Sequence, residues 1–460
     1  MTFPPTLLLW GALALPQTPA VQDAALPRAA RPARPPRPPV AEALVPERPN
    51  LLVVLLDDAG VETIPGYGLP VQGGHGPTPV IDALIDVGTH FRNAYASPVC
   101  SPTRLAILTG EYPHRYGVGV SINYAACQPE LTPPVDGSYE HLPALLAGAG
   151  YRTAAVGKWH MANQCNGEMT HPLLVGYETH RGPVNNIADF SSWEKYVDGV
   201  SVGVTTTYAT TDTADEAIAV IEAFGDEPWF VYTAFNAPHK PFHVPPAALR
   251  SLEVDEDSSD NLKHRAMLEA LDTELGRILS AIRPAVLERT IVVVMGDNGT
   301  PPTAVIDDDY LPAKGTTFEG GVHVPLVFAG AGIPEGEART GLVQAPDLFA
   351  TLLKLGGVEP PARDGLSYAA HLVGRAPDSP REMVYVHRNK PNGPAPWFDA
   401  DHRAARDRRY KIRRNENVGT MQVFDLIFDP NEDFPLPLVA LPPDAQESVS
   451  ALRQFINGLH

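Results

Sequence analysis

The stretch Leu51-Leu52-Val53-Val54-Leu55-Leu56, followed at once by Asp57-Asp58, decides the fold. An apolar run without alternation is typical of a strand buried on both faces, as in a parallel sheet covered by helices. Similar runs predict further strands at residues 152–157, 229–235, 290–296 and 324–328. Helical patterns lie between them at residues 142–149, 213–224 and 261–282. This alternation of strands and helices predicts an α/β domain.

The pattern changes after about residue 380. Short strand-like pieces precede a helical pattern at residues 445–459, and they lie at residues 383–386, 410–412 and 422–426. This order predicts a smaller C-terminal domain with an antiparallel sheet at residues 381–460, after the main domain at residues 49–380.

The N-terminus has the composition of an export signal. Residues 7–15 form an apolar segment that is too short to span a bilayer, and small residues around Ala20 follow it. We interpret residues 1–20 as a signal peptide, which predicts a periplasmic or secreted protein. An apolar leader on a cytosolic protein is the alternative. Residues 21–48 are rich in proline and arginine, which predicts a disordered, extended linker.

The composition excludes some classes of protein. Of the 460 residues, 44% are hydrophobic and 19% are charged, which is ordinary for a globular protein with a substantial core. The formal net charge of −19 argues against nucleic acid as a partner, because such a surface repels a phosphate backbone. We also expect no membrane span.

Acidic and amide side chains follow two of the predicted strands. Asp57 and Asp58 follow the first strand, and Asp297-Asn298 follows the strand at residues 290–296. Such residues are often solvated turn residues, but the carboxyl ends of strands in an α/β sheet converge on one binding site. Their oxygen atoms suit Ca²⁺ or Mg²⁺ better than zinc.

Three motifs with lysine or histidine accompany other strands. They are Gly157-Lys158-Trp159-His160, Ala237-Pro238-His239-Lys240-Pro241 and Lys314-Gly315-Thr316-Thr317-Phe318-Glu319-Gly320-Gly321. In an extended segment, His160 would lie on the same face as Lys158. Each motif alone is also typical of an exposed loop or a glycine-rich turn.

The most specific motif is Cys100-Ser101-Pro102-Thr103-Arg104, which Leu105-Ala106-Ile107-Leu108-Thr109-Gly110 follows. Alone, it would fit a small buried cysteine. Together with the other motifs, in the same order along the chain, it resembles the signature of formylglycine-dependent, arylsulfatase-like sulfatases. The closing Asp425-Leu426, Asp429-Pro430 and Glu432 are similar to the same family, so the resemblance covers roughly residues 50–435.

The resemblance implies the fold and the cofactors. The implied fold is alkaline-phosphatase-like: a large mixed, mostly parallel sheet sandwiched by helices, with the smaller C-terminal domain. A formylglycine-generating enzyme or an anaerobic sulfatase-maturating enzyme would convert Cys100 to formylglycine. The implied metal is Ca²⁺ or, in its place, Mg²⁺, and its implied ligands are Asp57, Asp58, Cys100, Asp297 and Asn298.

The resemblance also implies hydrolysis of sulfate esters. One hydroxyl of hydrated formylglycine, with its pKa lowered by the metal and Arg104, would attack the sulfur atom. Lys158 and Lys314 would neutralise the sulfate oxygens, and His239 would protonate the leaving alcohol. His160 would take a proton from the second hydroxyl, so that sulfate leaves.

Two alternatives stay open at this point. A formylglycine-dependent phosphonate monoester or phosphodiester hydrolase would use the same residues, and a non-catalytic binder of sulfated glycans would share the fold. The expected partner is a sulfated small molecule or glycan, with specificity in loops such as residues 182–198 and 389–406. If Cys100 is modified, Cys127 and Cys165 are left, either as a disulfide or as two separate thiols.

Overall fold

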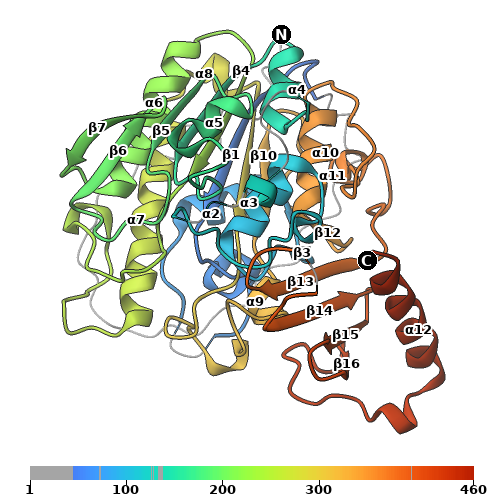
Figure 1. Ribbon diagram of the computed structural model, residues 1–460. Helices are drawn as coiled ribbons and strands as arrows, with labels where there is room; N and C mark the ends of the chain where they lie inside the picture. The colour runs from blue at the N-terminus through green and yellow to red at the C-terminus, as the bar shows by residue number, and fades with distance from the viewer. Residues whose placement is uncertain are drawn as a thin grey trace, which may run out of the picture. The chain divides into compact units, whose positions relative to one another are not determined.

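The computed structural model describes residues 45–459, except for 72–73, 126, 128, 133–137 and 395. The predicted signal peptide and the predicted linker up to residue 44 lie outside the described residues. The described strands form a ten-stranded sheet, a four-stranded sheet and a two-stranded sheet of β3 (Ala94–Tyr95) and β12 (Val343–Gln344) (Figure 1).

The first predicted strand lies inside the large sheet. β1 (Asn50–Leu56) pairs in parallel with β8 (Trp229–Ala234) on one side and with β9 (Thr290–Gly296) on the other. All residues of β1 are buried, as its unbroken apolar run predicts. The sheet order is β11-β2-β10-β9-β1-β8-β4-β5-β6-β7. The other strands are β2 (Gly88–Phe91), β4 (Arg152–Gly157), β5 (Thr179–Gly182), β6 (Trp193–Val197), β7 (Val200–Thr205), β10 (Leu326–Gly330) and β11 (Glu337–Arg339).

Helices cover both faces of this sheet (Figure 1). α3 (Cys100–Thr109), α4 (Leu142–Gly148) and α10 (Ala345–Leu355) pack together, and their apolar residues share one core with Leu51, Val53 and Leu55 of β1. The other layer contains α2 (Pro79–Val87), α6 (Ala209–Phe224) and α7 (Asp260–Ala281), which pack together. The remaining helices of this part are short: α5 (His171–Leu174), α8 (Pro284–Leu287), α9 (Glu319–Val322) and α11 (Ala369–Leu372). The predicted α/β class is therefore confirmed.

The predicted antiparallel C-terminal sheet is also confirmed. β13 (Val384–Lys390), β14 (Ala400–Arg406), β15 (Tyr410–Asn415) and β16 (Thr420–Asp425) follow one another in space as they do in the chain. α12 (Pro443–Gly458) packs on one face, where its apolar residues meet Tyr385, Ile412 and Val423.

Both expected specificity loops contain strands. Residues 389–406 include the end of β13 and all of β14, and residues 182–198 include β6. The segment Ala400–Arg406 has no valine, isoleucine, threonine, phenylalanine, tyrosine or tryptophan, so its composition does not signal a strand. It becomes one because β13 and β15 pair with it on both sides. α6 begins at Ala209 rather than at residue 213, because its first turn buries small and polar residues that carry no apolar period.

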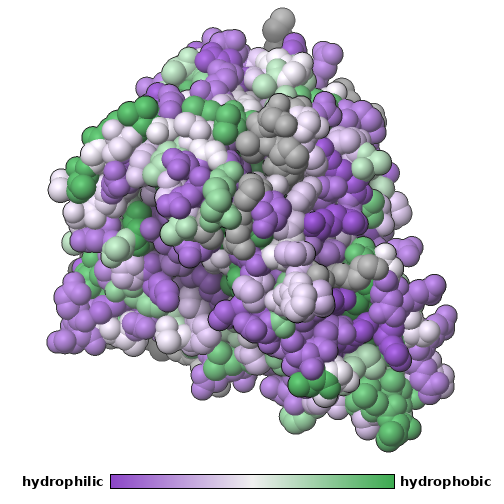
Figure 2. All heavy atoms as spheres, viewed as in Figure 1, coloured by the Kyte–Doolittle hydropathy of each residue, from purple (hydrophilic) through white to green (hydrophobic). Residues whose placement is uncertain are grey.

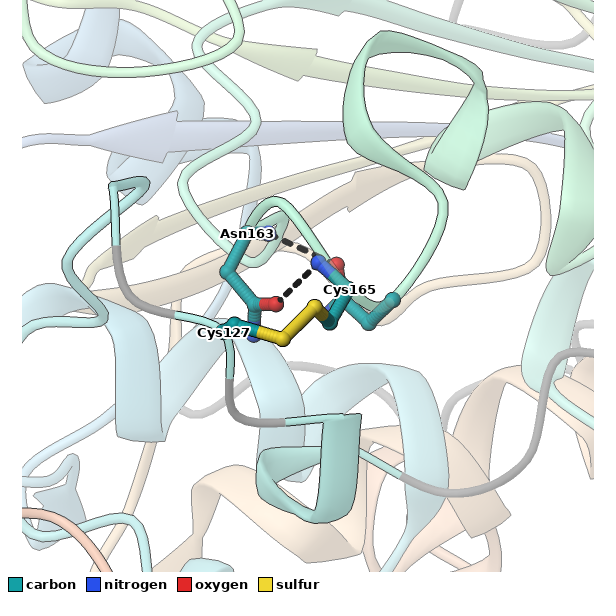
Figure 3. Close-up of a disulfide and its surroundings, with 4 residues drawn as sticks. Cys127, Asn163 and Cys165 are labelled. Carbon is teal, nitrogen blue, oxygen red and sulfur yellow. Dashed lines mark hydrogen bonds between the residues drawn. A yellow bond between two sulfur atoms is a disulfide. The ribbon is translucent and has the colours of Figure 1, made fainter.

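Cys127 and Cys165 form a disulfide across 38 residues (Figure 3). The side chain of Asn163 accepts a hydrogen bond of 2.9 Å from the backbone N–H of Cys165 and so fixes the turn that presents this cysteine. Cys100 is the free cysteine of the described residues, and it is buried. Of the two states that the sequence left open, the structure has the disulfide.

Reduction of this disulfide is expected to lower stability. In the entropic model, opening a loop of 38 residues costs about 4 kcal/mol, because the unfolded chain regains conformational freedom. We expect a fall in melting temperature of several degrees in the Cys127→Ser, Cys165→Ser double variant, measured by calorimetry. Equal melting temperatures for the double variant and the wild type would contradict a stabilising disulfide.

Exposed large hydrophobic side chains gather in two places. Val200, Val202 and Val204 lie along the edge strand β7, and Phe428 and Val439 lie between β16 and α12. Figure 2 shows hydrophobic residues at these two edges of a mostly hydrophilic surface. None of the helices in the described part of the chain combines the length and the apolar composition that crossing a membrane requires.

Candidate active site

The predicted acidic residues converge at the carboxyl ends of β1 and β9. Ligand atoms of Asp57, Cys100 and Asp297 lie within 4.8 Å of one another, and so do those of Asp57, Asp58 and His239. Asn298 donates a hydrogen bond of 2.8 Å to Asp58 Oδ1. The structure therefore brings together residues that are up to 240 positions apart in the chain.

The oxygen atoms of this cluster fit a hard divalent cation. Asp57 Oδ1, Asp58 Oδ2 and Asn298 Oδ1 are buried and have no hydrogen-bond partner among the described residues. Unpaired buried oxygens are costly, and a cation with oxygen ligands would satisfy all three. Asp58 also adopts a left-handed backbone conformation, with φ of 75°, which is uncommon for a residue other than glycine.

The charges around these carboxylates set their protonation. Burial would raise the pKa of Asp57, but the positive charges of Lys158, His239 and Arg104 outweigh it and hold that pKa below its ordinary value. Burial and the neighbouring Asp57 raise the pKa of Asp297 to about 7, against the effect of Arg104. As long as no cation neutralises the cluster, repulsion between the like charges therefore raises mainly the pKa of Asp297.

Cys100 is the first residue of α3, where the backbone N–H groups of the first turn favour negative charge. Its Sγ lies 3.1 Å from His160 Nδ1 and 3.5 Å from Ser121 Oγ. In a modified enzyme, the oxygens of formylglycine would stand near the place of this sulfur. Burial, followed by Lys158 and Arg104, lowers the pKa of His160 well below its ordinary value, so this imidazole is neutral and able to accept a proton.

His160 corrects one expectation. Its φ of 62° is left-handed, so the segment from Lys158 to His160 is not extended throughout. Ser101 supports this turn: its hydroxyl donates a hydrogen bond of 2.8 Å to the carbonyl of His160 and accepts one of 3.0 Å from the N–H of Ile122. The sequence placed Ser101 beside Cys100 but could not reveal this role, because its partners lie 59 and 21 residues away.

Arg104 lies one turn after Cys100 on α3 and is fully buried. Its guanidinium donates hydrogen bonds of 2.8 and 3.1 Å to Asp297 Oδ2 and one of 2.8 Å to the carbonyl of Lys158. Arg104 thus positions Asp297 and the end of β4 in this structure.

The two predicted lysines reach into the same cluster. The ammonium of Lys158 pairs with Asp57, and that of Lys314 pairs with Asp58. Burial would lower the pKa of Lys314, but Asp58 outweighs it and raises that pKa above its ordinary value. Lys314 is therefore charged, and both lysines reach the place where an anionic ligand would bind.

His239 lies in the loop after β8. Its Nδ1 is 2.6 Å from the carbonyl of Lys240, so Nδ1 carries a proton and donates this hydrogen bond, and its Nε2 is 3.8 Å from Asp58 Oδ2. Burial, followed by Lys158, lowers its pKa, although Asp58 opposes the shift. Nε2 is thus the atom that exchanges a proton on the side of the site.

A buried network anchors the segment that carries Lys314. Glu319, at the start of α9, accepts hydrogen bonds of 2.8 Å from Lys411, 3.2 Å from Arg406 and 2.7 Å from Tyr95. Lys411 also pairs with Glu432 at 3.2 Å. Lys411 and Arg406 belong to β15 and β14, so the C-terminal sheet holds the predicted Lys314–Gly321 motif in place. Glycine is required at position 320, because a Cβ there would collide with the carbonyl of Tyr310.

This network predicts acid sensitivity. Burial would raise the pKa of Glu319, but Lys411 and Arg406 lower it to about 2 from an ordinary 4.5. The ion pairs therefore add stability above about pH 4.5, and this contribution is lost as the pH falls toward 2. We expect unfolding free energy between pH 5 and pH 3, measured by urea titration, to fall less steeply in Glu319→Gln than in wild type. Glu222→Gln, on the exposed side of α6, is the matched control; an unchanged slope in Glu319→Gln would contradict the assignment.

Comparisons with known proteins agree with this geometry. The family model described as Sulfatase matches residues 49–358. N-acetylgalactosamine-6-sulfatase of Sus scrofa is 32% identical over 369 residues, covering 73% of this chain and 68% of that protein. Arylsulfatase A of Homo sapiens is 28% identical, covering 75% and 71%.

A similar solved structure is that of Ps i-CgsB in complex with k-i-k-neocarrahexaose. It has a TM-score of 0.74 and 24% identity, and it covers 89% of this chain and 92% of that chain. This likeness supports the same fold. The family model covers most of the chain and the relative from Sus scrofa is similar over two thirds of its own length, so the chain belongs to the sulfatase family and is a sulfuric ester hydrolase.

Proposed function

We propose that this enzyme hydrolyses sulfate esters through a formylglycine formed from Cys100, with a bound Ca²⁺ or Mg²⁺. One observation carries the proposal: Asp57, Asp58 and Asn298 each have a buried oxygen without a hydrogen-bond partner among the described residues, and ligand atoms of Asp57 and Asp297 lie within 4.8 Å of the sulfur of Cys100. The ligands of the cation would be these three residues with Asp297 and the modified Cys100.

Two groups absent from the unmodified chain supply part of the chemistry. Hydrated formylglycine carries two hydroxyl groups on one carbon, which allows one to accept the sulfuryl group and the other to drive the release of sulfate. The cation would lower the charge on the reacting oxygens. Side chains of this chain bind the substrate and transfer the protons.

Each of these side chains has a place in the reaction. Lys158 and Lys314 bind the sulfate oxygens and neutralise the charge that shifts among them in the transition state. His239, protonated on both ring nitrogens when it acts as the acid, gives the proton at Nε2 to the leaving alcohol oxygen as the sulfur–oxygen bond breaks. His160 Nδ1, 3.1 Å from Cys100 Sγ, takes the proton of the second hydroxyl. Arg104 keeps Asp297 in position.

The substrate class and the location belong to the same proposal. The relative from Sus scrofa is named N-acetylgalactosamine-6-sulfatase, and the similar solved structure is a complex with an oligosaccharide, k-i-k-neocarrahexaose. We propose a sulfated saccharide as substrate for this chain, and a formylglycine-generating or anaerobic sulfatase-maturating enzyme as its partner in maturation. The disulfide is typical of an oxidising compartment and supports a periplasmic or secreted location.

The test compares three ester classes. The full chain, produced together with a formylglycine-generating enzyme, is offered sulfated mono- and disaccharides, an aryl phosphonate monoester and an aryl phosphodiester. We expect release of inorganic sulfate with a kcat/KM well above that for either phosphorus ester. Turnover of the phosphorus esters alone would establish the alternative hydrolase, and turnover of none would overturn the proposed function.

A further inference from the structure

We infer that Arg388, His402 and Arg413 form a cationic subsite beside the active site, which binds a second anionic group of the substrate. The inference rests on the proposed function and makes it more specific: the preferred substrate is a sulfate ester that also carries a carboxylate or a second sulfate. The three residues are called the cationic triad below.

Strand pairing places the triad on one face of the C-terminal sheet. Arg388 of β13 lies directly opposite His402 of β14, and Arg413 of β15 lies opposite Ala404. Directly paired residues, and residues two apart in one strand, project from the same face, so the three basic side chains are neighbours. Burial, followed by Arg388 and Arg413, lowers the pKa of His402, although Asp401 opposes the shift, so a bound anion would favour the protonated ring.

This face turns toward the large sheet. Val384, Val386 and Ala404 share it with the triad and pack in one apolar cluster with Tyr95 and Val322. The opposite face is covered by α12. The triad therefore continues the face on which the C-terminal sheet meets the main part of the enzyme.

Arg413 and the residues after β13 connect the strands of the triad to the active site. Arg413 donates a hydrogen bond of 3.1 Å to Thr317 Oγ1, three residues after Lys314. Its guanidinium also lies over the ring of Phe318.

On the β13 side, Asn392 accepts hydrogen bonds of 3.0 Å from the N–H groups of Gly119 and Val120. The neighbouring Ser121 Oγ is 3.5 Å from Cys100 Sγ. The C-terminal sheet that carries the triad thus contacts the segment that carries Lys314 through Arg413, and the segment that borders the nucleophile through the residues after β13.

No acidic side chain neutralises the triad among the described residues. Arg388 Nε is buried without a hydrogen-bond partner. The nearest carboxylates serve other cations: Asp401 pairs with His387 and Arg403, and Glu432 pairs with Lys411. Burial lowers the pKa of Arg413 to about 10, although Glu432 opposes this shift.

An unpaired, half-buried cationic cluster is unfavourable for the fold by itself. It is also improbable by composition, because acidic residues outnumber basic ones by 54 to 35 in this chain. An anionic ligand would reduce the repulsion and could accept a hydrogen bond from the unsatisfied Nε of Arg388. Guanidinium groups bind planar carboxylates and sulfate oxygens through paired hydrogen bonds, which identifies the chemistry of the ligand.

The test measures binding to the full chain with Cys100→Ala, which prevents turnover. The ligands are N-acetylgalactosamine 6-sulfate, the disaccharide in which a uronate is joined to that sugar, and N-acetylgalactosamine 4,6-disulfate. By calorimetry, we expect at least one second anion to tighten Kd about tenfold or more. Adding Arg388→Gln is expected to reduce this gain to less than about threefold, and Arg388→Lys is expected to keep part of it.

Two controls distinguish loss of the subsite from a general loss of positive charge or of stability. Arg453→Gln removes an exposed arginine of α12 on the other side of the sheet and should leave the gain unchanged. Arg388→Gln should not lower the melting temperature, because it removes a charge without a partner. The carboxylate and disulfate arms identify which anion is preferred. Equal affinity for all three ligands, absence of binding by all three, or a gain that survives Arg388→Gln overturns the inference. Sulfate release by the unaltered enzyme tests the proposed function separately.

Discussion

Replacement of Cys100 by alanine is expected to abolish turnover of sulfate esters, with a fall in kcat of about 10⁴-fold or more. The alanine side chain has no atom from which the nucleophile can be made. The fold should survive, because the substitution removes one buried sulfur and leaves a cavity worth about 1 kcal/mol. Steady-state kinetics and a thermal melt of the same preparation check both parts.

Cys100→Ser separates the two steps of the reaction. Serine keeps one oxygen at this position and so retains an acceptor for the sulfuryl group, but it has no second hydroxyl on the same carbon. We expect at most one equivalent of alcohol to be released, after which the enzyme stays sulfated and inactive. Sustained turnover by the serine variant at the wild-type rate would contradict the assigned role.

Removal of the cation is expected to have the second largest effect. Asp57, Asp58 and Asp297 converge within a buried cluster, so loss of a divalent cation leaves like charges that Lys158, Lys314 and Arg104 oppose only in part. Exhaustive chelation should lower activity about 10³-fold or more and should also lower the melting temperature. Addition of Ca²⁺ or Mg²⁺ should restore both quantities, and the better of the two identifies the cation.

A matched pair of variants tests the site directly. Asp57→Asn should weaken cation binding by at least about 100-fold, measured by titration calorimetry. Asp272→Asn changes another buried aspartate, which accepts hydrogen bonds of 2.9 and 2.8 Å from the first N–H groups of α2, and should leave cation affinity unchanged. Full activity after chelation, with no metal by elemental analysis, would disprove the metal site.

The sequence alone predicted the positions of site residues that directly follow a buried strand. The apolar runs at β1 and β9 predicted buried parallel strands, and the acidic residues that follow them were expected to meet because the carboxyl ends of such strands share one edge. The same reasoning brought Lys158 and His239 toward the site. These residues need only their own strand to place them.

The sequence alone did not predict the position of a residue or strand that is held by partners far away in the chain. The left-handed turn at His160 is held by Ser101, and the strand Ala400–Arg406 exists only through its neighbours. The cationic triad is a further case, since Arg388, His402 and Arg413 become neighbours only through the register of three strands. Local composition carries no signal for any of these contacts.

The most direct test of the account is the mass of the peptide that contains Cys100. Trypsin releases residues 93–104, and conversion to formylglycine makes this peptide lighter by one sulfur and two hydrogens and heavier by one oxygen. Across preparations with different degrees of conversion, the account predicts that specific activity rises in proportion to the modified fraction and extrapolates to zero. A preparation whose Cys100 is wholly unmodified but which turns over sulfate esters at the same rate would contradict it.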